Sequence, residues 1–256
     1  MHLTMKNPPT LFIFVLTLLL FSTMPLHAQT KKPALLFDIH LGGGVSAADL
    51  NDRYGNHMCV GIGTSYQLKN NHQSFGVNYS YFFGTKVKED VLKPFRTSEE
   101  GLLIGADFLL AEIKLKERGY YFQMHYGGLI PFKNDRVTHG FKWQLGIGFL
   151  SHKIRIQDDA RAVRQFNSEF NKGLDRLTNG VAFIPFLGYE YQQKNGRICF
   201  YGGFEPILGL TSSKRTWNYD TNNSEHKKER LDVLINFKVG WKLPLSTHQE
   251  SQAIEY

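Results

Sequence analysis

The sequence predicts an all-β fold: an eight-stranded antiparallel transmembrane β-barrel with long extracellular loops, one of them expected to contain a short helix. Three observations predict it. They are an apolar N-terminal segment of signal-peptide length, apolar and polar residues that alternate with a period of two, and connections that alternate between short and long. The 256 residues are 42% hydrophobic and 21% charged, which excludes disordered and collagen-like chains and suits one domain.

Residues 1–28 have the pattern of a cleaved export signal. Lys6 supplies a positive start, the run from Leu11 to Phe21 is strongly apolar, and Ala28 offers a small residue at the cut. An uncleaved membrane anchor is the alternative, but the run is shorter than the roughly 20 residues that a spanning helix needs. We therefore expect residues 29–245 to form the barrel and residues 246–256 to form a short periplasmic tail.

The alternation recurs along the mature chain and is clearest in its last segment. There the apolar positions are Leu231, Val233, Ile235, Phe237, Val239, Trp241 and Leu243. A soluble β-sandwich also alternates, so it is the competing fold. One face of each strand is long and apolar, with aromatic residues near its ends, and the opposite face is rich in glycine and charge. These features favour a lipid-facing wall around a narrow polar lumen.

The number of strands follows from parity, since both ends of such a barrel lie in the periplasm. We expect strands near residues 35–46, 57–69, 73–85, 111–131, 141–156, 180–193, 197–212 and 230–245. Short turns then fall at 69–72, 133–136 and 194–196 on one side. Long loops fall at 47–56, 86–110, 157–179 and 213–229 on the other side.

Two stretches fit this scheme less directly. Residues 101–110 are apolar enough for a further strand, but a ninth strand would break the parity, so we place them inside the second long loop. In the fourth strand the apolar phase slips from Ile113 and Leu115 to Tyr120 and the residues after it. A β-bulge near Arg118 and Gly119 would explain the slip.

Certain segments resemble a known group of proteins. They are Gly146 to Ile156 with its His-Lys-Ile-Arg-Ile ending, Asp175 to Gly180, and the closing Val239-Gly240-Trp241. With the glycine-rich alternation, the chain resembles small eight-stranded outer-membrane barrels of the OmpA transmembrane-domain type, in particular uncharacterised barrels of Bacteroidota. The resemblance implies residence in an outer membrane that contains large assembly and secretion machines, and it assigns no reaction.

Polar residues on the inward faces are expected to fill the lumen. An eight-stranded barrel is just wide enough for side chains, so these residues should pair with one another as a polar network. The network is expected to include Asp38, His40, Glu205, Asp232 and Lys238. A small porin-like channel is the alternative. Cys59 and Cys199 should lie near opposite ends of the barrel, too far apart to form a disulfide.

No catalytic, cofactor-binding or metal-binding residue is assigned. A serine–histidine–acid set could be assembled from Ser151, His152 and Asp158, or from Ser80 and His125, but no nucleophile-elbow pattern accompanies either set. The histidines are scattered without ligand spacing. A lipid-modifying outer-membrane enzyme therefore remains only an alternative.

Two of the long loops carry apolar residues that could dock a partner. In the third loop the apolar spacing predicts a short amphipathic helix, with Asp158 or Asp159 as its cap. Its apolar side could cover the barrel's own mouth or another protein, and the apolar run of the second loop raises the same question. The candidate docking residues are Leu102, Leu103, Ile104, Phe108, Val163, Phe166, Phe170 and Leu174.

The fourth loop is basic. Its charges, which could contact phosphate groups of outer-leaflet lipid and glycolipid or simply be solvated, are Lys214, Arg215, Lys227, Lys228 and Arg230. Nucleic acid is not expected as a partner of an exported barrel, despite the sequence pI of about 9.3. Together with the envelope that the resemblance implies, the docking loops lead us to expect a non-enzymatic accessory or scaffold subunit of an outer-membrane protein assembly or secretion machine.

Overall fold

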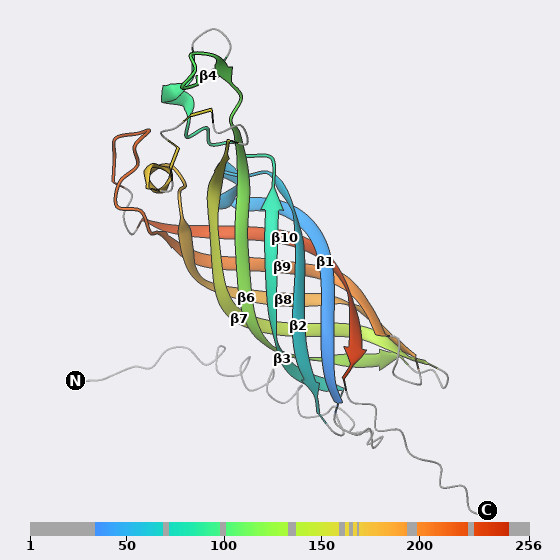
Figure 1. Ribbon diagram of the computed structural model, residues 1–256. Helices are drawn as coiled ribbons and strands as arrows, with labels where there is room; N and C mark the ends of the chain where they lie inside the picture. Colours follow the sequence, from blue (N-terminus) through green and yellow to red (C-terminus); the bar gives the residue numbers. More distant parts are fainter. Residues whose placement is uncertain are drawn as a thin grey trace, which may run out of the picture.

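The computed structural model is a closed antiparallel β-barrel with an assembly of loops at one end (Figure 1). The structure describes residues 34–68, 72–97, 101–132, 137–158, 162–163, 166–167, 169–193, 199–224 and 228–245. The predicted signal peptide, the predicted tail and most of the three short turns therefore lie outside the described residues.

Eight strands form the barrel, as the sequence predicts. They are β1 (Ala34–Ala48), β2 (Asn56–Gln67), β3 (Gln73–Gly84), β6 (Lys114–Phe132), β7 (Val137–Gln157), β8 (Thr178–Gln193), β9 (Cys199–Ser213) and β10 (Glu229–Pro244). Each strand pairs with the next barrel strand along the chain, and β10 pairs with β1 to close the ring. Closure leaves no unpaired edge, which is what a sheet in a lipid environment requires.

The alternation separates an outer face from a filled lumen. On β10, Ile235 and Phe237 are exposed on the outside, whereas Asn236 and Lys238 between and beside them are fully buried inside. Side chains of a strand point alternately to opposite faces, so one apolar and one polar set follow directly from the sequence pattern. The predicted inside and outside assignment of this strand is confirmed.

The predicted β-bulge in the fourth barrel strand is wrong. The pairing of β6 with β7 runs without interruption from Lys114 opposite Gln157 to Phe132 opposite His139. Ile113 and Leu115 do not face outward; they lie on the inward side, where Ile113 is buried. At this end of the strand the inside supports the loops and the outside meets polar surroundings, so the polarity of the two faces reverses without a slip in register.

Residues 101–110 stay inside the second loop, as predicted. They carry a separate two-stranded sheet of β4 (Leu103–Ile104) and β5 (Leu110–Ala111), which lies at the far end of the loop assembly (Figure 1). The other regular elements of the loops are three 3₁₀ turns. They are η1 (Asp49–Asp52), η2 (Lys93–Phe95) and η3 (Phe170–Gly173).

The third loop contains a short helix, as predicted, but this is the 3₁₀ turn η3 and not an amphipathic helix that begins near Val163. Among the described residues of this loop the one helical element is η3. Asp158 does accept two backbone hydrogen bonds, from the amides of Ala162 at 3.0 Å and Val163 at 2.9 Å, but Ala162 and Val163 themselves are not helical. Asp159 lies outside the described residues. The apolar spacing reflects residues that pack down onto the barrel mouth.

An apolar cluster fills the upper part of the barrel, beneath and among the loops. Loop residues such as Leu50, Tyr54, Leu92 and Leu174 are fully buried there together with inward strand residues such as Leu150. Within the described residues, no helix is long and apolar enough to cross a membrane.

Candidate functional site

The lower half of the lumen holds a compact polar network. The ammonium group of Lys242 donates to Glu190 at 2.6 Å, and that of Lys142 lies 3.3 Å from the same carboxylate. Lys142 also lies 3.4 Å from the centre of the Tyr201 ring, a cation–π contact. All of these residues are buried, so each charge is held by a partner inside the barrel.

The middle of the lumen contains a second group of paired charges. Lys238 forms an ion pair with Glu205, which also accepts a hydrogen bond from the Tyr121 hydroxyl at 2.6 Å. Nearby, Asp38 lies 2.6 Å from Nδ1 of His40, and Nε2 of His40 lies 2.8 Å from Oγ of Ser80.

The Ser80, His40 and Asp38 side chains have the connectivity of a nucleophilic triad. The sequence sets of Ser151 with His152, and of Ser80 with His125, did not find it, because only barrel pairing brings these three residues together. Ser80 is fully buried, and its oxygen is 2.7 Å from where a side chain on Gly61 would begin. This packing leaves no room for an acyl substrate, so the three residues form part of the polar core.

Near the loops the network continues through Asp232. This carboxylate accepts from Thr211 at 2.5 Å, lies 2.8 Å from Nε2 of His152 and 3.4 Å from Nε of Arg230. Asp38, His40, Glu205, Asp232 and Lys238 are thus all buried in the lumen, with partners there.

Little empty space remains in the lumen. One pocket of about 20 Å³ lies by the periplasmic end, beside Leu36 and Gln192, and a second of about 10 Å³ lies beside Ser65 and His125. A cavity needs a volume of roughly 10–15 Å³ to hold one water molecule, so each of these pockets is large enough for about one water. The described lumen is therefore a filled core.

The outer wall has the composition of a lipid-facing surface. Exposed aliphatic residues cover its middle, and aromatic pairs such as Tyr126 with Trp143 and Phe200 with Trp241 lie towards the end opposite the loops. A closed barrel with this exterior and a polar interior is stable only across a membrane. The chain is an integral outer-membrane β-barrel protein.

Comparisons with known proteins give similar chains among solved structures alone. No family model and no curated protein matches the sequence. Among solved structures, Neisserial surface protein A is 10% identical, with 83% of this chain and 99% of that chain covered and a TM-score of 0.44. The N-terminal barrel domain of Pseudomonas aeruginosa OprF is 11% identical, with 84% and 100% covered and a TM-score of 0.38. The likeness concerns the barrel fold alone. The closed ring of eight strands confirms the predicted small outer-membrane barrel, and the resemblance to Bacteroidota barrels stays a prediction.

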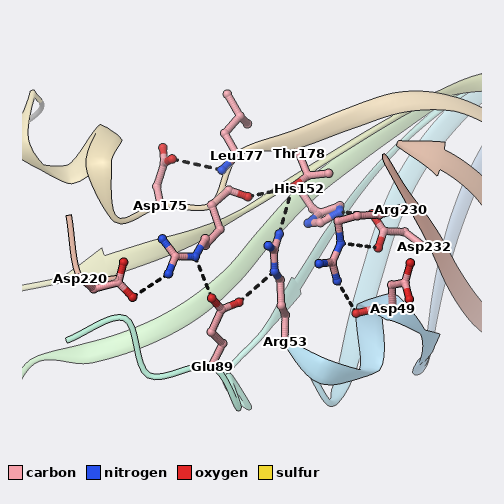
Figure 2. Close-up of polar contacts among 11 residues, drawn as sticks. Asp49, Arg53, Glu89, His152, Asp175, Leu177, Thr178, Asp220, Arg230 and Asp232 are labelled. Carbon is pink, nitrogen blue, oxygen red and sulfur yellow. Dashed lines mark hydrogen bonds and ion pairs between the residues drawn. The ribbon is translucent and has the colours of Figure 1, made fainter. Parts of the chain in front are cut away.

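A chain of ion pairs ties the four loops together above the barrel (Figure 2). Glu89 of the second loop bridges Arg53 of the first loop at 2.8 Å and Arg176 of the third loop at 2.7 Å. Arg176 in turn donates to Asp220 of the fourth loop at 2.6 Å. Burial by itself would lower the pKa of Arg176, but the carboxylates of Glu89 and Asp220 have the larger effect and raise that pKa above its usual value. Because each member comes from a different loop, no local spacing in the sequence could reveal the chain.

The basic fourth loop is partly used within the protein. Arg215 makes a two-pronged ion pair with Asp175 at 2.7 and 2.6 Å, which raises the pKa of the arginine. Arg230 is bonded to Asp232 and to the backbone carbonyl of Asp49 (Figure 2). These two guanidinium groups serve the loop assembly, contrary to the expectation that they reach lipid phosphate. Lys214 and Lys228 are exposed, and Lys227 lies outside the described residues.

The candidate docking residues divide into two groups. Some are covered in this conformation: Leu103, Val163 and Leu174 are buried in the core, Phe166 and Phe170 are half-buried against it, and Leu102 is half-buried. The others form the tip of the β4–β5 hairpin, where Ile104 is 58% and Phe108 90% exposed. Leu109 and Leu110 beside them are exposed as well. Among these candidate docking residues, those at the tip are the ones that remain exposed to a partner.

Metal-binding side chains do not gather anywhere in the described parts of the chain, where no three His, Cys, Asp or Glu residues are placed to hold an ion. Cys59 and Cys199 are both buried and free, as the sequence predicts.

Proposed function

We propose that this chain is a non-enzymatic subunit of an outer-membrane protein assembly or secretion machine, and that it docks a protein partner through the tip of its second loop. The observation that carries the proposal is the exposed apolar set Ile104, Phe108, Leu109 and Leu110 on the β4–β5 hairpin. The hairpin projects from the far end of the loop assembly (Figure 1), so a partner can reach it. Apolar side chains held out into water usually mark an interaction site.

Ion pairs between the loops support the same proposal. Those among Arg53, Glu89, Arg176 and Asp220 link the four loops at the end of the barrel from which the hairpin projects. A surface that is already ordered loses less conformational entropy on binding, so more of the apolar contact is retained as affinity.

The filled lumen and the packed Ser80 argue against the two other functions. A porin-like channel needs a hydrated path, whereas the described lumen has pockets of about 20 and 10 Å³. A lipid-modifying enzyme needs a nucleophile that substrate can reach, and the triad-like Ser80 is fully buried.

Site-specific crosslinking in cells tests the proposal. A photoreactive amino acid at position 108 should crosslink to one outer-membrane protein, while the same group at the exposed Lys93 of that loop should not. Replacing Phe108 and Leu109 by Ser should lower co-isolation of that protein at least about tenfold, because burial of two large apolar side chains is lost. Equal crosslinking at both positions, or co-isolation that survives the substitutions, would contradict docking through the tip.

A further inference from the structure

A patch of basic residues lies on the outer wall of the barrel, just below the loops. Its members are Lys114, Lys116 and Arg118 on β6, with Lys153 and Arg155 on β7. On β6 the outward positions are the even-numbered ones, which include the exposed Tyr120 and Phe122. On β7 they are the odd-numbered ones, so all five basic side chains project from the same outer face.

The strand register places like charges directly opposite one another. Lys116 pairs across the ladder with Arg155, and Arg118 pairs with Lys153 on the next rung of the same face. Like charges at such positions destabilise a sheet unless an anion lies between them.

The described protein supplies little negative charge to this patch. Lys114 lies 3.6 Å from Glu112, both of them exposed, and this is a weak ion pair. Arg118 donates to the backbone carbonyl of Glu117 and lies 5.9 Å from the centre of the Phe83 ring. No carboxylate of the described residues is within ion-pair distance of Lys116, Arg118, Lys153 or Arg155. Four positive charges therefore lack a counter-ion among the described residues.

The height of the patch matches the headgroups of the outer leaflet. Trp143, beside Tyr126, marks the aromatic belt away from the loops, and Lys153 lies ten positions farther along the same strand. Ten residues at about 3.3 Å each, on a strand tilted by about 40°, rise about 25 Å, which is the height of the apolar band of such barrels. The aromatic residues Tyr120 and Phe149, whose ring centres are 6.4 Å apart, lie just below the charges, as the aromatic girdle at a membrane interface would.

We propose that the β6–β7 wall binds the phosphorylated headgroup of an outer-leaflet glycolipid, with phosphate oxygens held between the pairs Lys116–Arg155 and Arg118–Lys153. Two stacked rungs of opposed cations suit a headgroup with more than one negative charge. Such contacts combine charge with hydrogen bonding, which arginine and lysine both provide to phosphate. The site is separate from the fourth loop and does not depend on the docking of a protein partner.

Unfolding titrations in two kinds of vesicle test the proposal. The protein is folded into phosphatidylcholine vesicles with and without bisphosphorylated lipid A, and the urea midpoint is measured. Lipid A should raise the wild-type midpoint. In the variant Lys116→Gln/Lys153→Gln/Arg155→Gln the lipid fraction needed for half of that rise should increase about tenfold, equivalent to about 1.4 kcal/mol. In phosphatidylcholine alone this variant should be at least as stable as the wild type, because the repulsion is relieved.

Matched controls make the outcome decisive. Lys86→Gln/Lys93→Gln/Lys172→Gln removes the same charge from exposed loop positions and should respond like the wild type. Lys153→Glu, which places an acid opposite Arg118, should be stable without lipid A and should respond to it less than the wild type, and it serves if the triple variant folds poorly. An equal rise with dephosphorylated lipid A, phosphatidylglycerol or inorganic phosphate would overturn the proposal. So would an unchanged response of the wall variants, or loss of the response in the loop control.

Discussion

Charged residues inside this barrel differ in whether they have a partner. Glu205 is fully buried, but Lys238 and Tyr121 satisfy its carboxylate. Glu117 is also fully buried, near the upper end of β6, and neither of its carboxylate oxygens has a hydrogen-bond partner in the described protein. Burial without a partner is costly for a polar group, whereas a buried pair resists the loss of either member.

Neutralising the two glutamates should therefore change stability in opposite directions. Glu117→Leu should raise the free energy of unfolding by about 1 kcal/mol, since an unpartnered polar group is replaced by an apolar side chain of similar size. Glu205→Gln should lower it by about 3 kcal/mol, because Lys238 is left buried without its counter-charge. Urea titrations of the two variants in the same phosphatidylcholine vesicles measure both values. Changes of the same sign would mean that Glu117 has a partner, such as an ordered water.

At the scale of the single strand, the period-two pattern sets which face each residue occupies. It succeeds on β10 because both faces of this strand keep one environment along the apolar band, lipid outside and lumen inside. It fails at the upper end of β6, where Ile113 lies inside beneath the loops and Lys116 outside. At that end the pattern still separates an apolar face from a polar face, but the apolar face is the inner one. The strand has left the bilayer there, so its outer face meets polar surroundings and its inner face packs beneath the loops.

Arginine substitutions along the outer face of β10 should show a dependence on depth. Ile235→Arg should destabilise the folded barrel by about 2–4 kcal/mol, because the position lies near the middle of the bilayer. Leu231→Arg on the same face, close to the loops, should cost about 0–1 kcal/mol. Folding titrations into phosphatidylcholine vesicles measure the difference. Equal costs at the two positions would contradict the placement of β10 across the membrane.

Across the whole molecule, two layers close the barrel. The apolar cluster and the ion-paired loops cover the upper end, and the polar network fills the lumen below them. The two layers form independently, since the cover at the upper end depends on the loops and the polar network in the lumen depends only on the eight strands. Removal of one layer should leave the other in place.

This arrangement leads to an expected result for conductance. Replacing residues 160–174 by a short Gly-Ser loop removes no strand, so the protein should still fold and shift on unboiled gels. In planar bilayers it should remain non-conducting like the wild type, because Glu205, Lys238 and Tyr121 still fill the lumen. Conductance should appear only when these lumen side chains are also shortened to Ala. Stable conductance steps from the loop truncation alone would show that the loops are the main barrier.

The fold follows from short-range information, and the candidate sites do not. The alternation, the turn residues and the parity of the strand count together predict an eight-stranded barrel, because side-chain direction in a strand depends only on position along the chain. The same pattern places Asp38, Glu205 and Lys238 in the lumen. It also leaves residues 101–110 outside the barrel, as the structure has them.

Contacts between distant segments were decided only by the closed sheet. Closure brings Ser80 to His40, and it brings Arg53, Glu89, Arg176 and Asp220 from four loops into one chain of ion pairs. The register of β6 with β7 likewise sets Lys116 opposite Arg155, although neither residue stands out in its own segment. A one-dimensional pattern records which face a residue occupies, whereas partners depend on how strands align across the ladder and on how loops meet above it. That alignment is a property of the tertiary structure.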